Sequence, residues 1–190
     1  MEIIEIFGFI TGVVGVYLTL KEKLLCFPVG LVNVILSLYL FYVQKLYADA
    51  IQQFVYIILL SYGWYHWQHG KEKDNSVSIT RSSTSFFISS LAGGVLVAFL
   101  LGYFLKEYTD ASFPWIDSSA TAAAFVAQWF VAKKKIENWI LWIFVNLSYI
   151  AIYAYKSLWF YVLLFIIYLV LSFWGYKSWK QQLLKNATTS

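Results

Sequence analysis

The chain has 190 residues, of which 61% are hydrophobic, 21% aromatic and 13% charged, and its formal net charge is +4. Soluble domains are about 45–50% apolar and about 25% charged, and disordered chains combine low hydrophobicity with high charge, so both classes are excluded. The single cysteine, Cys26, excludes a disulfide scaffold. A polytopic membrane protein remains.

Seven mostly apolar stretches approach the length that a membrane helix needs, about 20 residues. We therefore expect an all-α protein that crosses the lipid bilayer seven times. The predicted spans cover residues 3–20, 24–43, 47–67, 85–105, 117–132, 139–155 and 158–176. Residues 68–84 form the longest polar stretch and are expected to be an exposed loop. The short connections leave no room for a soluble catalytic domain.

Polar side chains in the second and third spans mark the interior of the predicted bundle, because polar groups in hydrocarbon are costly. The second span carries Asn33. In the third span, Asp49, Gln53 and Tyr56 are spaced four and three residues apart, which places them on one helix face. This face is a candidate binding surface. The alternative is that Asp49 lies at the water interface and Gln53 ties two helices together.

His66 and His69, at the end of the third span, are three residues apart and could share a metal ion. Apart from Asp74, no Cys, Asp or Glu at ligand spacing completes such a site, so we predict interfacial histidines and no metal or cofactor. The chain also lacks a nucleophile motif and a phosphate loop. We therefore predict neither an enzyme, with no catalytic residues assigned, nor an ATP-driven pump.

The fourth and fifth spans differ in polarity. The fourth is poor in polar aromatic residues and contains Gly93-Gly94, which is typical of a passive connector. In the fifth span, Asp117, Thr121 and Gln128 share one face. Asp117 is expected to be a helix N-cap or, as the alternative, an entrance charge. Gln128 lies deeper and is the better candidate for the site.

The sixth span carries a continuous stripe with steps of three, four, three and four residues: Trp139, Trp142, Asn146, Tyr149 and Tyr153. Such a stripe can stack on a flat ring and form hydrogen bonds with its edge. The alternative is an aromatic packing seam with Trp139 in the interfacial belt. For Trp139 the packing seam is preferred, and for Trp142 with Asn146 a binding site is preferred.

The cationic residues predict the orientation. If the N-terminus lies outside, three of the 14 Lys and Arg residues fall in outer segments and eleven in inner segments. Cytoplasmic loops are enriched in cations, so we expect an outer N-terminus and a cytoplasmic C-terminus. The lysines are scattered over loops and do not predict a nucleic-acid partner.

The second half of the chain repeats a pattern of the first. Three identical pairs share one sequence offset, and an Asn pair departs from that offset by a single position. The pairs are Tyr56 with Tyr168, Gly63 with Gly175, Trp67 with Trp179, and Asn33 with Asn146. The repeat predicts two parallel three-helix units joined by one linker helix, a known transporter plan with substrate bound near the midplane.

This repeat divides the chain into four regions. We expect the first three-helix repeat over residues 1–67, a cytoplasmic loop and linker helix over 68–105, the second repeat over 106–176, and a cytoplasmic tail over 177–190. The two Asn residues are expected to face each other across a central cavity.

Together these features resemble the PnuC-type vitamin transporters over almost the whole chain. The resemblance is carried by Gly30-Leu31-Val32-Asn33, Lys45-Leu46-Tyr47-Ala48-Asp49 with Gln53 and Tyr56, Tyr62-Gly63-Trp64-Tyr65-His66-Trp67, and Lys134-Lys135-Ile136-Glu137-Asn138-Trp139 with Trp142 and Asn146. It implies a three-plus-one-plus-three bundle related to the SWEET sugar transporters. It also implies facilitated uptake of an unphosphorylated vitamin across the bacterial inner (plasma) membrane, a homotrimer, and a functional link to an intracellular vitamin kinase.

Two departures from this family bear on the substrate. Many members carry Trp where this chain has Phe27, and several riboside transporters have an N-terminal extension that is not expected here. These features resemble the thiamine branch. Thiamine and nicotinamide riboside are both cations with a flat aromatic ring, which Trp and Tyr faces attract. Thiamine is therefore the favoured substrate and nicotinamide riboside the alternative.

The sequence thus predicts a uniporter that works by alternating access. The expected substrate-binding residues are Asn33, Gln53, Tyr56, Gln128, Trp142, Asn146 and Tyr149. Trp142 would stack on the ring, while the Asn and Gln side chains would read its polar edge. The competing hypotheses are a membrane enzyme, which would need paired carboxylates at membrane depth, and a substrate-binding subunit of a larger transporter.

Overall fold

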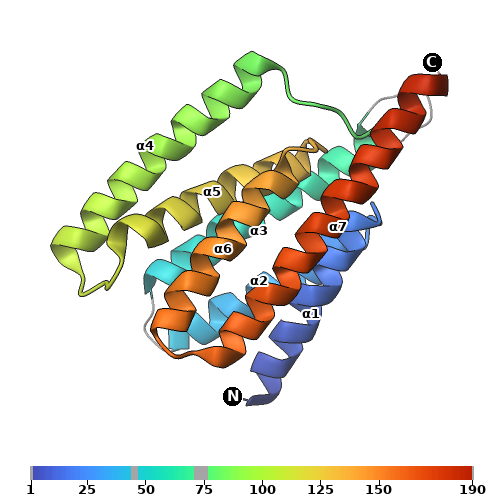
Figure 1. Cartoon of the computed structure of the whole chain (residues 1–190). Helices are drawn as coiled ribbons and strands as arrows, with labels where there is room; N and C mark the ends of the chain where they lie inside the picture. The colour runs from blue at the N-terminus through green and yellow to red at the C-terminus, as the bar shows by residue number, and fades with distance from the viewer. Residues whose placement is uncertain (1, 44–46, 71–76, 190) are drawn as a thin grey trace.

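The computed structural model describes residues 2–43, 47–70 and 77–189, which form seven α-helices (Figure 1). The helices are α1 (Glu2–Leu20), α2 (Cys26–Val43), α3 (Tyr47–His69), α4 (Thr84–Tyr108), α5 (Pro114–Ala132), α6 (Asn138–Tyr155) and α7 (Trp159–Thr189). The predicted all-α fold and the seven helices are confirmed for these residues. Asp74, Lys45 and Leu46, which the sequence analysis used, lie outside the described residues.

All seven helices differ from their predicted bounds at one end or at both, and two of these differences have a clear physical cause. Helix α5 begins at Pro114 rather than at residue 117, because the fixed φ of proline suits the first helical turn. Helix α7 continues to Thr189, past the predicted end at residue 176. No Gly or Pro follows residue 176, and Trp179 is fully buried. Core packing therefore stabilises the additional turns.

Four of the described helices contain stretches that are long and apolar enough to cross a membrane, in α2, α4, α6 and α7, and α1 contributes a shorter apolar stretch, Ile6–Leu20. Helices α3 and α5 do not reach that apolarity. They carry Asp49, Gln52 and Gln53, and Asp117 and Gln128, respectively. These two helices thus supply most polar side chains to the candidate site.

The helix contacts divide the bundle into two similar groups. Helix α2 packs between α1 and α3, and α6 packs between α5 and α7. The groups meet through α3 with α5 and through α1 with α7. Among the described helices α4 packs against α5 alone, and it lies at the outside of the bundle (Figure 1).

The turns before α2 and α6 have the same backbone conformation. Glu22 and Lys134 both adopt a left-handed conformation, with φ of 53° and 49°. In each turn, the amide of the left-handed residue donates to the carbonyl group three residues before it. The amide of the following residue donates to the carbonyl group five residues before itself. The four N···O distances are 2.8–3.0 Å. This is the hydrogen-bond pattern of a helix end closed by a left-handed residue. The two turns are separated by the same offset as the repeated Tyr, Gly and Trp pairs.

A buried aromatic core lies at the end of the bundle where α2 and α6 begin, and it consists of Phe27, Trp67, Trp139 and Trp179. Phe27 packs edge-on against Trp67 with ring centroids 5.0 Å apart, and Trp139 packs edge-on against Trp179 at 5.4 Å. The rings of Trp67 and Trp179 lie 6.3 Å apart and join the two groups of helices. Each half of the chain thus supplies one edge-on pair.

Two glycines allow these rings to approach the helices. A Cβ on Gly63 would lie 2.5 Å from Phe27 Cε1, and one on Gly175 would lie 2.6 Å from three atoms of the Trp139 indole. Both distances are well below van der Waals contact, so only glycine fits at either position. The matching positions of Gly63 and Gly175 in the two halves therefore have a packing cause.

Candidate functional site

Polar and aromatic side chains from α3, α5 and α6 meet inside the bundle in an interior cluster of Gln52, Tyr56, Thr121, Phe125 and Tyr149. Tyr56 packs edge-on against Phe125, with ring centroids 5.4 Å apart. The hydroxyls of Thr121 and Tyr149 form a hydrogen bond of 3.3 Å. The Gln52 side chain lies near the hydroxyls of both Tyr56 and Tyr149. The cluster thus combines flat ring surfaces with hydroxyl and amide groups.

An aromatic wall between α6 and α7 extends this cluster. The ring of Phe165 lies 5.0 Å from Tyr149 and 5.5 Å from Tyr153, and it meets Tyr168 at 5.8 Å. Tyr149 and Tyr153 are one helical turn apart and stack at 5.9 Å. Tyr149 and Tyr153, two members of the predicted stripe on the sixth span, are therefore one side of a wall that α7 completes.

One end of the interior cluster is acidic. The carboxylates of Asp49 on α3 and Asp117 on α5 lie close enough to interact electrostatically, and Lys156 at the end of α6 interacts with both. Asp117 is not the N-cap that we preferred, because α5 begins at Pro114 and Phe113 precedes it as the cap residue. Its carboxylate instead lies in the first turn, where the helix dipole favours an anion.

The side-chain amides of the two predicted Asn residues connect helices. Asn33 donates to the Gly8 carbonyl at 2.6 Å and to Thr11 Oγ1 at 3.1 Å, which ties α2 to α1. Asn146 is buried and donates to Ser172 Oγ at 3.1 Å, which ties α6 to α7. Each amide nitrogen thus donates to a helix of its own half of the chain, rather than into the space between the halves. Buried amides need partners, and these amides find them on adjacent helices.

The remaining predicted site residues occupy different surroundings. Gln53 is half-buried beside Gln52. Gln128 is 9% exposed and lies one turn beyond Phe125, on the same face of α5. Trp142 is half-buried and packs against the aromatic core.

Trp139 is 1% exposed and belongs to that core. The packing alternative for Trp139 is therefore confirmed, although its place is the bundle core and not the interfacial belt. A large apolar side chain at the centre of the helix contacts is buried there because this removes its surface from water and lipid headgroups alike.

The two histidines lie against aromatic rings. His66 stacks on Tyr62 with centroids 5.9 Å apart, and His69 stacks on Tyr65 at 4.6 Å. Within the described ranges, no group of three or more His, Cys, Asp and Glu side chains could hold a metal ion.

Gln52 was not among the residues predicted for the candidate site. The spacing contained the necessary signal, because Gln52 follows Asp49 by three residues and precedes Tyr56 by four. Spacing alone does not distinguish Gln52 from the adjacent Gln53, because both lie close to the helix face of Asp49 and Tyr56. The position of α6 shows that Gln52 lies near Tyr149.

The amino-acid sequence is similar to those of known transporters. A sequence model of the family described as "Nicotinamide mononucleotide transporter" matches residues 2–181. The chain is 24% identical to the nicotinamide riboside transporter PnuC of Escherichia coli (strain K12), over 93% of this chain and 84% of that protein. It is 28% identical to the riboflavin/roseoflavin transporter RibM of Streptomyces davaonensis, over 92% of this chain and 83% of that protein.

The fold matches a solved structure. The crystal structure of the vitamin B3 transporter PnuC superposes with a TM-score of 0.74 and 24% sequence identity, covering 94% of this chain and 81% of that chain. The likeness shows that the two chains share a fold.

Proposed function

Because the chain belongs to the nicotinamide mononucleotide transporter family, we propose that it transports nicotinamide riboside across a membrane. The observation that carries this proposal is the match of residues 2–181, which includes every residue of the interior cluster. Thiamine, which the sequence favoured, has no support from the named relatives. The alternative, nicotinamide riboside, has the support of a relative that aligns with 93% of the chain.

The chemistry of the interior cluster fits this substrate. Nicotinamide riboside presents a flat cationic ring, which tyrosine faces attract, and a ribose with hydroxyls that side-chain amides can bind. Tyr56 and Tyr149 supply the ring surfaces, and Gln52 and Gln53 supply amides on α3. Asp49, at the acidic end of the cluster, supplies the charge that attracts a cation.

Trp142, Asn146, Gln128 and Asn33 complete the proposed lining in different roles. Trp142 and Gln128 offer a ring and an amide from α6 and α5. Asn33 and Asn146 each donate to a neighbouring helix and therefore act on the substrate by holding the lining in place.

The transport cycle that we propose rests on two parallel three-helix repeats, α1–α3 and α5–α7, with α4 as the linker. Its supports are the two identical turns at equivalent positions of the two halves, the paired glycines under the aromatic core, and the matching contacts of α3 with α5 and of α1 with α7. Rocking of one repeat against the other would expose the interior cluster to each side in turn.

The orientation that we propose follows the positive-inside rule. The N-terminus lies outside, and the α5–α6 turn with Lys133, Lys134 and Lys135 faces the cytoplasm across the bacterial inner membrane. The acidic end of the cluster then faces outward, where a cationic substrate would enter.

Uptake into liposomes that contain the purified protein tests this proposal. We expect radiolabelled nicotinamide riboside to enter the liposomes until its concentration is equal inside and outside. We expect Tyr149→Ala to raise the KM of this uptake at least about tenfold, as loss of a cation–π and packing contact predicts. Tyr103→Ala is the matched control, because Tyr103 is 53% exposed on the peripheral α4. Uptake of riboflavin or thiamine with no uptake of the riboside would overturn the substrate assignment. A Tyr149→Ala protein with an unchanged KM would overturn the site.

A further inference from the structure

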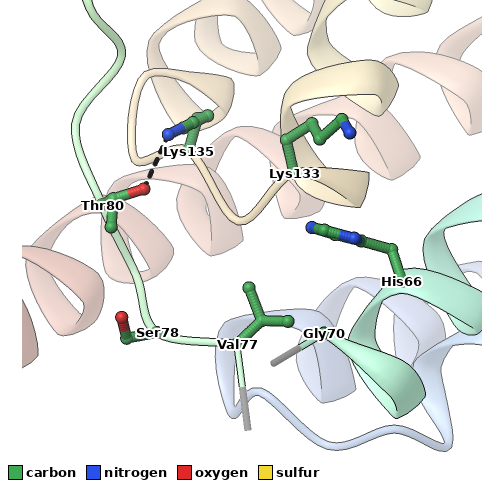
Figure 2. Close-up of a pocket in the computed structure, with 7 residues that line it drawn as sticks. All are labelled: His66, Gly70, Val77, Ser78, Thr80, Lys133 and Lys135. Atoms are coloured by element: carbon green, nitrogen blue, oxygen red, sulfur yellow. Dashed lines mark hydrogen bonds between the residues drawn. The ribbon is translucent and has the colours of Figure 1, made fainter. Parts of the chain in front are cut away.

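A cleft of about 290 Å³ lies at the end of the bundle that holds the aromatic core (Figure 2). It is bounded by the last turns of α3, by a strap of residues 77–83, and by the α5–α6 turn. The described residues that line it are His66, Gly70, Val77, Ser78, Thr80, Lys133 and Lys135. The cleft lies outside the interior cluster, so transport as proposed above does not use it.

Hydrogen bonds hold the walls of the cleft together. The Thr80 amide donates to the Lys134 carbonyl, and the Ile136 amide donates to the Thr80 carbonyl, both at 3.1 Å. Further along the strap, Ser82 bonds to Glu137. The Glu137 carboxylate accepts from the Ser82 amide at 3.1 Å and from the Ser82 hydroxyl at 3.0 Å. The strap is therefore pinned to the α5–α6 turn, and the cleft is a built feature of the fold.

Two lysines line the cleft, and among the described residues their ammonium groups contact only neutral groups. Lys135 Nζ donates to Thr80 Oγ1 at 2.8 Å (Figure 2), and Lys133 Nζ donates to the Tyr62 hydroxyl. Both acceptors are neutral. Among the residues that the structure describes, no carboxylate lies within 4.0 Å of either ammonium group, whereas Lys134 pairs with Glu22 at 2.9 Å.

The imidazole of His66 lies on the same side of the cleft as Lys133, opposite Lys135 and Thr80, and points into the cleft (Figure 2). Its ring is stacked on Tyr62, which fixes its direction. The side chains of Lys133, Lys135, His66 and Thr80 thus line a space large enough for a small anionic group. All four can donate hydrogen bonds.

We propose that this cleft binds a phosphate group. A phosphate carries enough charge to compensate two lysines and enough acceptor oxygens for the imidazole and the hydroxyl as well. Lysines on flexible stems can turn from their neutral acceptors to such an anion without movement of the backbone. The group could belong to an anionic phospholipid at the membrane surface or to a free phosphate monoester in solution, and the chemistry of the cleft is the same for both.

Ligand-dependent thermal stability of the purified full-length protein tests this proposal and separates the two sources. In one arm, inorganic phosphate is titrated into detergent solution at constant ionic strength against chloride. In the other arm, the protein is melted in mixed micelles with phosphatidylglycerol or with phosphatidylcholine. Stabilisation by inorganic phosphate identifies a free-anion site, and stabilisation by phosphatidylglycerol alone identifies a lipid headgroup site.

The variants place the effect in the cleft. We expect Lys135→Gln and Lys133→Gln each to raise the half-saturating concentration about tenfold, as loss of one charge-assisted hydrogen bond predicts, and Lys135→Arg to retain most of the affinity. Lys180→Gln removes an exposed cation beside Trp179 at the same end of the bundle. This variant should change the half-saturating concentration less than about twofold. Lys133→Gln covers the case that Lys135→Gln does not fold, because Lys133 makes no bond to the strap. Absence of stabilisation by either probe, or equal effects of Lys133→Gln and Lys180→Gln, would overturn the proposal.

Because these measurements detect binding and not uptake, they are independent of the liposome experiment. A protein that binds phosphate in the cleft but transports no riboside would retain this inference and lose the proposed function.

Discussion

Replacing Gly175 by alanine should destabilise the bundle through a single contact. A Cβ at this position would lie 2.6 Å from three atoms of the Trp139 indole, whereas ordinary contacts between carbon atoms are about 3.5–4.0 Å. Trp139 is 1% exposed and edge-on to Trp179, so the ring cannot move into solvent. Either α7 shifts or the aromatic core opens.

The magnitude follows from comparison with Gly93, where an added Cβ meets no atom within 4 Å. Both glycines are inside helices, so alanine gains the same helix propensity at each, about 0.8–1 kcal/mol. Gly175→Ala alone adds the cost of overpacking, about 1–3 kcal/mol. The difference between the two variants therefore isolates the steric cost.

Thermal melting of the two variants in the same detergent measures this difference. For a chain of this length 1 kcal/mol shifts the Tm by about 2–4 °C, so Gly175→Ala should melt about 2–12 °C below Gly93→Ala. The gap should shrink when Trp139→Phe is present in both proteins, because the smaller ring removes the clash. If Gly175→Ala melts at or above Gly93→Ala, the packing argument for the paired glycines is wrong.

Two further predictions concern the same end of the bundle. The Trp67 indole donates to a backbone carbonyl of α5 at 3.1 Å, whereas the buried indole nitrogen of Trp179 has no partner among the described residues. Trp67→Phe should therefore lower the unfolding free energy more than Trp179→Phe, by about 1–3 kcal/mol. Equal Tm values of the two variants would contradict this prediction. The Lys134–Glu22 ion pair, 8% and 18% exposed in its side chains, joins the two groups of helices. Lys134→Glu should increase maleimide labelling of the buried Cys26, and adding Glu22→Lys should restore protection; failure of the double variant to do so would show that the pair does not hold the two groups together.

The sequence predicted the helices well and the contacts of single polar side chains less well. Each apolar stretch became a helix, and Trp139, Asn146, Tyr149 and Tyr153 of the predicted stripe contact α7. The roles of single polar residues were less predictable. Asn33 and Asn146 have the same chemistry as Gln52, but the first two donate to adjacent helices while Gln52 reaches two tyrosines.

The sequence by itself determined that this is a seven-helix, multi-pass protein built on a pattern that recurs in its second half. Hydropathy, helix length and spacing are properties of contiguous segments, and a segment in lipid must satisfy its own backbone by forming a helix. The tertiary structure alone decided that the strap at Thr80 pins the α5–α6 turn and opens a basic cleft beside His66. That arrangement depends on contacts between residues far apart in the chain, and no local pattern encodes which distant donor meets which acceptor.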